Sequence, residues 1–151
     1  MPIYASALLP EHPAAVPPVR PASAGAPCDT RCSFAAVGAL PPAEILTTID
    51  VGPSLLAMTH HSILAAAYHR NDKPMAELIR AFTGDPSVAH AIAARHRIGY
   101  VLIEPQSNEA ELYQSLGPNG LMAGLRRGRA PAWLQPVPLG GSEFRLWRVV
   151  G

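Results

Sequence analysis

The chain has 151 residues, which is enough for one hydrophobic core and too few for two comfortable domains. Its 12 Lys and Arg residues nearly balance 11 Asp and Glu residues, and the net charge of +1 argues against a nucleic-acid binder with a basic face. Thr, His, Pro or Gly interrupts every apolar run well before the roughly 20 residues that a membrane-spanning helix needs, so we expect a soluble chain without a transmembrane segment.

Residues 1–27 are rich in Pro and Ala and show almost no hydrophobic periodicity. Such a segment cannot bury enough apolar surface to offset the entropy cost of ordering it. The sequence therefore predicts a disordered or polyproline-like arm over residues 1–27, dispensable for folding, and a single α/β domain over residues 28–151. The arm has no basic start, and Pro10 ends its short apolar run, so we do not expect it to be an export signal.

Cys28 and Cys32 are the only cysteines, and they lie where the arm meets the domain. A C-x₃-C pair alone is weak evidence for zinc, because a structural zinc site needs four ligands. Three alternatives stay open: two free thiols, a disulfide between Cys28 and Cys32, or half of a metal site that histidine completes. The disulfide would imply an oxidising compartment.

A strand, a turn, a short helix and a second strand are predicted over residues 45–67. Residues 45–49 are apolar and β-branched, and the run breaks at the sequence DVGP, where Gly frees the backbone and Pro suits the first turn of a helix. The helix is expected over residues 53–59 and the second strand over residues 62–67. A connection of about a dozen residues is about the minimum for a crossover between parallel strands.

Capped helices and a third strand follow. One helix begins near Pro74 and ends before Gly84, and the next begins at Asp85 and Pro86, an N-cap followed by proline in the first turn. Residues 98–103 predict the third strand, which returns after helices as parallel strands do.

A further helix, a short helix and a hairpin complete the chain. Asn108 is the expected cap of the further helix, with Leu112, Tyr113 and Leu116 as its apolar side. The hairpin is expected over residues 133–149, and its Pro136 and Pro138 are typical of an outer strand. The sequence thus predicts a small mixed, mainly parallel sheet flanked by helices, with the C-terminal hairpin at its edge.

Polar residues follow each of the three parallel strands. The carboxyl ends of such strands meet at one edge, where open α/β sheets bind ligands. We therefore predict a ligand-binding site with these members: Asp50, Gly52, His69, Arg70 and Glu104. Helix N–H groups, a guanidinium and an imidazole would hold a phosphate or carboxylate there. The same residues also fit a structural network in which Arg70 forms ion pairs with Asp50 or Glu104.

His60 and His61 are expected to be structural. They lie between the short helix and the second strand, roughly 20 Å from His69, because a strand of about six residues separates them. Polar groups at the end of a helix also complement its dipole. We therefore predict neither a metal site nor a bound cofactor.

Several short strings occur in a fixed order between residues 28 and 149: DVGP, THH, YHRN, GYVLI, GRAPAWLQPV and FRLWRV. In these strings the chain resembles the C-terminal soluble domain of large, uncharacterised bacterial polytopic membrane proteins of the glycosyltransferase-C type. In those proteins the domain follows many transmembrane helices on the periplasmic side. The resemblance implies a place at the periplasmic face of the inner membrane, with a membrane glycosyltransferase-like body or a lipid-linked sugar phosphate as partner.

The resemblance also sets limits. The catalytic acidic residues of that class lie in a loop near the start of the membrane part, which this chain lacks, so no activity carries over. In the relatives a cysteine often follows the third strand and could pair with one before the first strand. Glu104 stands in that place here, which leaves Cys28 and Cys32 only each other.

The leading hypothesis is a non-catalytic accessory domain that packs on such a membrane body or binds part of its substrate. The sequence contains no G-x-S-x-G, no H-E-x-x-H and no phosphate-binding loop, so we expect no enzyme activity from this chain alone. The alternative is a small anion-binding module or enzyme that uses the carboxyl edge of the sheet. There His69 would act as acid or base, and Asp50 or Glu104 would orient it.

Overall fold

The computed structural model describes residues 29–65 and 72–151. In chain order the elements are α2 (Thr30–Gly38), β1 (Glu44–Thr47), α3 (Gly52–Met58), β2 (Ser62–Ile63), α4 (Asp72–Thr83), α5 (Pro86–Arg95), β3 (Ile98–Ile103), α6 (Asn108–Leu116), α7 (Leu121–Arg126), β4 (Leu134–Val137) and β5 (Arg145–Val149). The predicted arm, Cys28, His69 and Arg70 lie outside the described residues, so the expectations for them stay predictions. Cys32 lies on α2, and the described residues include no free cysteine.

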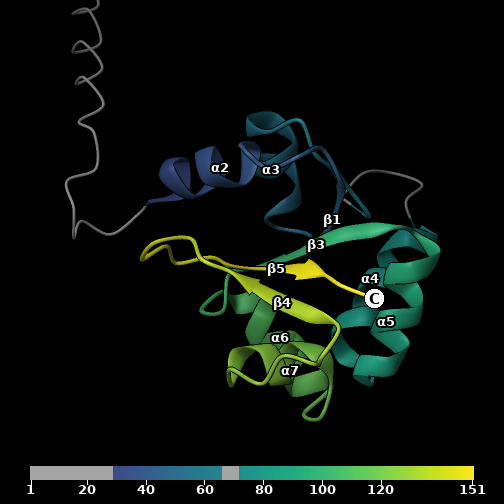
Figure 1. Cartoon of the computed structure of the whole chain (residues 1–151). Coiled ribbons are helices and arrows are strands. Elements are labelled where there is room, and N and C mark those ends of the chain that lie inside the picture. Colours follow the sequence, from purple (N-terminus) through teal and green to yellow (C-terminus); the bar gives the residue numbers. More distant parts are fainter. Residues whose placement is uncertain (1–28, 66–71) are drawn as a thin grey trace, which may run out of the picture.

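The strands form one mixed sheet in the order β2-β1-β3-β5-β4 (Figure 1). β1 pairs in parallel with β2 and with β3, whereas β5 pairs antiparallel with β3 and β4. The predicted α/β fold is therefore confirmed, with a parallel half built from the first three strands and the C-terminal hairpin at the other end. The parallel pairing of β1 and β2 also confirms the predicted crossover.

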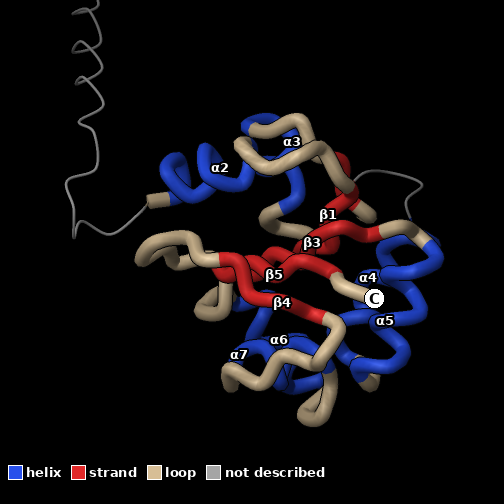
Figure 2. Tube along the Cα trace, in the orientation of Figure 1, coloured by secondary structure: helices blue, strands red, loops and turns tan. Residues whose placement is uncertain are grey.

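Helices cover both faces of the sheet, which gives a three-layer α/β/α arrangement (Figure 2). α2 and α3 lie on one face, and α4 to α7 lie on the other. α3 connects β1 to β2 over the first face, while α4 and α5 lead from β2 back over β1 to β3 on the second. Both connections join parallel strands, as βαβ units require.

β1 and β3 are buried on both faces, which explains their continuous apolar sequences. Ile45, Tyr100 and Leu102 pack in the cluster beneath α2 and α3. Their neighbours Leu46 and Val101 pack in the larger cluster with α4 to α7. Alternate residues of one strand thus hold two helical layers together.

Glycines in the loop after α6 allow a close approach to the end of α4. A Cβ on Gly117 would lie 2.0 Å from the carbonyl oxygen of Thr83, and a Cβ on Gly120 would lie 2.4 Å from the same atom. The Leu121 N–H also donates to the Gly84 carbonyl at 3.1 Å. This contact fixes α7 against α4.

The structure corrects two expectations for α6. Its N-cap is Ser107, whose hydroxyl accepts the Ala110 N–H at 3.1 Å, whereas Asn108 is the first helical residue. Leu112 and Leu116 were expected to be buried with Tyr113, but they are 53% and 62% exposed. The prediction was wrong because other residues of α6 already fill the contact with α4 and α7, so this apolar pair remains at the surface.

The hairpin confirms the expected outer strand. Among the described strands β4 pairs only with β5. The Trp133 carbonyl accepts the Val150 N–H at 2.9 Å, so the odd-numbered residues of this segment direct their backbone groups toward β5. The backbone groups of Leu134, Pro136 and Pro138 therefore point away from β5. The two prolines offer no N–H to another strand.

His60 and His61 have different environments. His61 is 4% exposed; its Nδ1 accepts the Ala43 N–H at 3.1 Å, and its Nε2 donates to the Val37 carbonyl at 2.7 Å. The first bond places the ring proton on Nε2. His61 thus connects the end of α2 to the start of β1, while His60 is exposed.

We predict that His61→Ala lowers the free energy of unfolding by about 2–3 kcal/mol, because it leaves a buried N–H and a buried carbonyl without partners. His60→Ala, the matched control, should change it by less than about 0.5 kcal/mol. Urea denaturation followed by circular dichroism measures both, and equal losses would contradict the assigned roles.

Candidate functional site

The described members of the predicted site lie at the carboxyl edge of the sheet. Asp50 and Gly52 follow β1, and Glu104 follows β3. Burial raises the pKa of the Glu104 carboxyl, and the negative charges of Glu143 and Asp50 raise it further. The edge therefore brings Asp50 and Glu104 within electrostatic reach of each other, together with Glu143, which lies two residues before β5.

Gly52 is required for packing. A Cβ at this position would lie 2.7 Å from the Cδ1 atom of Ile63 on β2. Its N–H donates to the Thr48 carbonyl at 3.1 Å. The amide of Gly52 is thus already bonded within the chain, and its missing side chain allows α3 to approach β2.

Glu109 of α6 is the residue at this edge that sequence reasoning missed. Its carboxylate accepts the Ile49 N–H at 2.7 Å and the Asp50 N–H at 2.8 Å, one on each oxygen. These are amides of the turn after β1, where the sequence predicted an anionic ligand. An anion does bind there, but it is a side chain of the same molecule.

Tyr113 completes the contact around Glu109. Its hydroxyl donates to the Glu109 carboxylate at 2.6 Å, and its ring stacks on Phe82 of α4 with centroids 5.8 Å apart. Burial raises the pKa of the Tyr113 hydroxyl, and the bond to Glu109 raises it further, so the hydroxyl stays protonated and can donate. We call Glu109, Tyr113 and the amides of Ile49 and Asp50 the carboxylate clamp.

The described part of the carboxyl edge is acidic. Four carboxyl groups lie at or beside it, from Asp50, Glu104, Glu109 and Glu143. No ion pair within residues 29–65 and 72–151 neutralises any of them. Negative charge at this edge weakens the attraction of a phosphate, so the predicted anion site depends on His69 and Arg70, which lie outside the described residues.

Thr47 and Thr48 bury their hydroxyls at the end of β1, and no described residue bonds either oxygen. Adjacent residues of an extended segment point to opposite faces of a sheet, so the two hydroxyls do not converge on one site. In the described part of the chain, no group of three or more His, Cys, Asp and Glu side chains could hold a metal ion.

We predict that Glu109→Ala lowers the free energy of unfolding by about 2–4 kcal/mol, because two backbone N–H groups lose a charged acceptor. Glu109→Gln keeps one acceptor oxygen and should lose less. Glu111→Gln is the matched control, since Glu111 is exposed on the same helix and should have little effect. Chemical denaturation checks the order, and a loss for Glu111→Gln equal to that for Glu109→Gln would contradict the clamp.

A second prediction concerns pH. The raised pKa of Glu104 means that the folded chain holds this proton more tightly than the unfolded chain, so ionisation of Glu104 disfavours folding. This loss of stability is absent below the pKa that Glu104 has in the unfolded chain. It is complete above the raised pKa that Glu104 has in the folded chain. Glu104→Gln should therefore be more stable than the unaltered chain at neutral pH, by less than about 1 kcal/mol because the group is partly solvated. Thermal melts should show this advantage disappear on acidification, and a constant difference would contradict it.

Comparison with known proteins adds a structural relative. No family model and no curated protein matches the sequence. Among solved structures the chain is similar to the C-terminal globular domain of an oligosaccharyltransferase from Archaeoglobus fulgidus, with a TM-score of 0.57 and 10% sequence identity over 78% of this chain and 91% of that one. At this identity the likeness shows a shared fold.

Proposed function

We propose that the chain is a non-catalytic accessory domain that associates with the extracytoplasmic side of a membrane glycosyltransferase-like protein. The observation that carries the proposal is the fold. It matches nearly the whole of a C-terminal globular domain whose parent protein is an oligosaccharyltransferase. The sequence resemblance to C-terminal domains of glycosyltransferase-C proteins supports the same assignment independently, because it rests on short strings rather than on the arrangement of strands.

The carboxyl edge supports an accessory role. In the described residues the Ile49 and Asp50 amides donate to the Glu109 carboxylate, and the Gly52 amide donates to the Thr48 carbonyl. The groups that would bind and polarise a substrate in an open α/β enzyme are thus used to hold the fold together. An accessory domain needs no free group at this edge.

The exposed side of α6 offers a surface for the partner. Leu112 and Leu116 are four residues apart and therefore lie on the same side of the helix. Exposed apolar side chains of this kind are typical of protein contact sites when they lie together. No helix of the described residues is long and apolar enough to cross a bilayer.

Site-specific photo-crosslinking tests the proposal. A photoreactive amino acid replaces Leu116 in the full chain, which is expressed in its native membranes, and mass spectrometry identifies the product. We expect a polytopic membrane protein with glycosyltransferase sequence features, because the apolar pair on α6 would contact it. The same probe at Ala94, an exposed residue of α5, serves as the matched control.

Two results would overturn the proposal. One is a crosslink from position 116 to soluble proteins alone, and the other is equal labelling from positions 116 and 94. Turnover of sugar phosphates or nucleotide sugars by the purified chain would contradict the non-catalytic part.

A further inference from the structure

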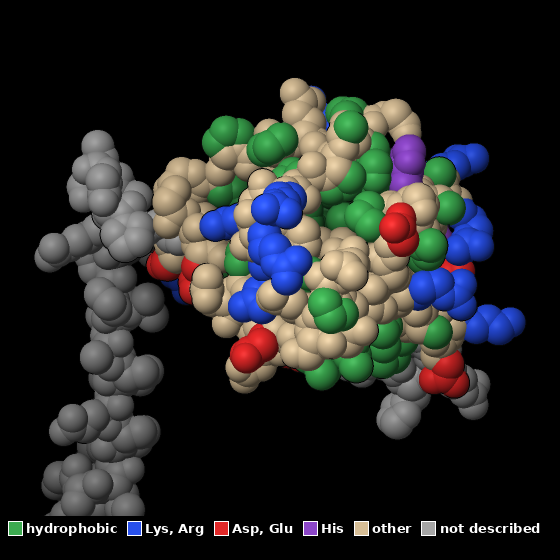
Figure 3. Space-filling model, turned by 90° about the horizontal axis from the view of Figure 1, so that it is seen from below, with side chains coloured by type: hydrophobic (Ala, Val, Ile, Leu, Met, Phe, Trp, Pro, Cys, Tyr) green, Lys and Arg blue, Asp and Glu red, His purple; other side chains and the backbone are tan. Residues whose placement is uncertain are grey.

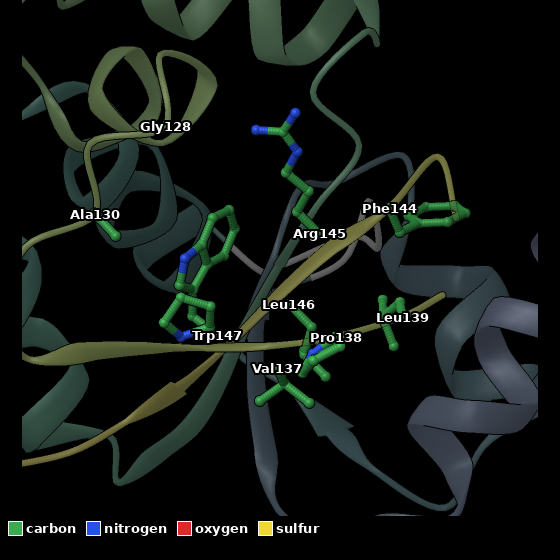
Figure 4. Close-up of a pocket in the computed structure, with 10 residues that line it drawn as sticks. Gly128, Ala130, Val137, Pro138, Leu139, Phe144, Arg145, Leu146 and Trp147 are labelled. Carbon is green, nitrogen blue, oxygen red and sulfur yellow. The ribbon is translucent and has the colours of Figure 1, made fainter. Parts of the chain in front are cut away.

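An apolar groove lies along the C-terminal hairpin. Its volume is about 350 Å³, and we call it the hairpin groove. Its lining residues are Gly128, Ala130, Pro136, Val137, Pro138, Leu139, Phe144, Arg145, Leu146 and Trp147. Figure 4 shows Arg145 and Trp147 projecting from the side of β5 that faces Gly128 and Ala130. Arg145 is the only charged residue of this lining.

The edge of β4 excludes one class of occupant. Pro136 and Pro138 have no N–H, and the Leu134 N–H donates to the Pro131 carbonyl at 3.0 Å. The outward side of β4 therefore offers carbonyl acceptors without matching donors. A peptide that added as a further strand would leave half of its ladder unbonded. The occupant of the hairpin groove must bind through apolar contact and charge.

Two arginines lie at the groove. Arg129 follows its lining residue Gly128, Arg145 belongs to the lining, and both are exposed. Arg129 and Arg145 form no ion pair with any residue in the described ranges. We call these two residues the arginine rim. Figure 3, which views the molecule from the side of α6 and α7, shows Lys and Arg side chains gathered in the middle of that face.

The groove lies close to carboxyl groups as well as arginines. Arg145 pairs in register with Ile103, the residue before Glu104, and Glu143 precedes the lining residue Phe144. The exposed arginines next to the exposed side chains of Pro136 and Pro138 complement a surface with negative headgroups above hydrocarbon. A purely acidic soluble ligand would pair with the arginines but would not contact the apolar lining of the groove.

We propose that the hairpin groove and the arginine rim bind the surface of a membrane containing anionic lipids. This contact would orient the domain beside the membrane protein with which it associates, and so it rests on the proposed function for its setting. It uses a different surface from Leu112 and Leu116 on α6. Failure of lipid binding would therefore leave the crosslinking result intact, and failure of crosslinking would not abolish lipid binding.

Co-sedimentation of the full chain with vesicles tests the inference. We expect binding to an equal mixture of phosphatidylcholine and phosphatidylglycerol, little binding to phosphatidylcholine alone, and weaker binding at high salt. Arg145→Gln should reduce the affinity about fivefold, the effect of removing one arginine near an anionic surface. Arg145→Lys keeps the charge and should restore most of it.

Arg148→Gln is the matched control. Arg148 is an exposed arginine on the same strand, but it alternates with Trp147 and so points to the other face of β5. Its replacement should change the affinity less than twofold. Absence of binding to the anionic vesicles, or equal losses for Arg145→Gln and Arg148→Gln, would overturn the proposal. Binding to polyglutamate but not to vesicles would also overturn it and would assign the surface to an acidic peptide.

Discussion

The carboxylate of Glu109 connects α6 to the turn that follows β1. It bonds the amides of Ile49 and Asp50 at the end of β1, while Tyr113 holds it from the next turn of α6. Tyr113 also stacks on Phe82, so the contact joins α4, α6 and the end of β1. The turn that a related enzyme fold would present to a ligand is thereby fixed by the chain itself. Any ligand that uses these amides must first displace Glu109.

Negative charge gathers at the carboxyl edge of the sheet. Burial raises the pKa of the Glu104 carboxyl there, and the negative charges of Glu143 and Asp50 raise it further. Arg145 of the hairpin groove lies next to this negative charge, because it pairs in register with Ile103 and follows Glu143 by two residues. Orientation at a charged surface depends on the distribution of charge rather than on the total.

The likeness to an oligosaccharyltransferase domain concerns the fold, and folds of this class carry many functions. The proposed accessory role therefore rests on how this chain uses its own groups. Backbone donors at the carboxyl edge are bonded internally, the prolines of β4 close one edge of the sheet, and Leu112 and Leu116 remain exposed. These features favour contact with a partner over chemistry on a substrate.

The sequence by itself determined the elements that depend on near neighbours. Apolar β-branched runs predicted the first and third parallel strands, whereas the second, predicted over residues 62–67, is a strand only at Ser62–Ile63 within the described residues. Asp85 and Pro86 predicted the start of α5, and Pro136 and Pro138 predicted the outer strand. These features follow from side-chain periodicity and backbone chemistry within a few residues.

Contacts between distant residues were decided only by the tertiary structure. Glu109 bonds amides 60 and 59 residues away, and no local pattern distinguishes it from the exposed Glu111. Leu112 and Leu116 have the spacing of a buried stripe, yet burial depends on whether another element covers that side of the helix. The physical reason is that periodicity fixes which residues share a face, whereas the packing of the whole chain fixes what that face meets.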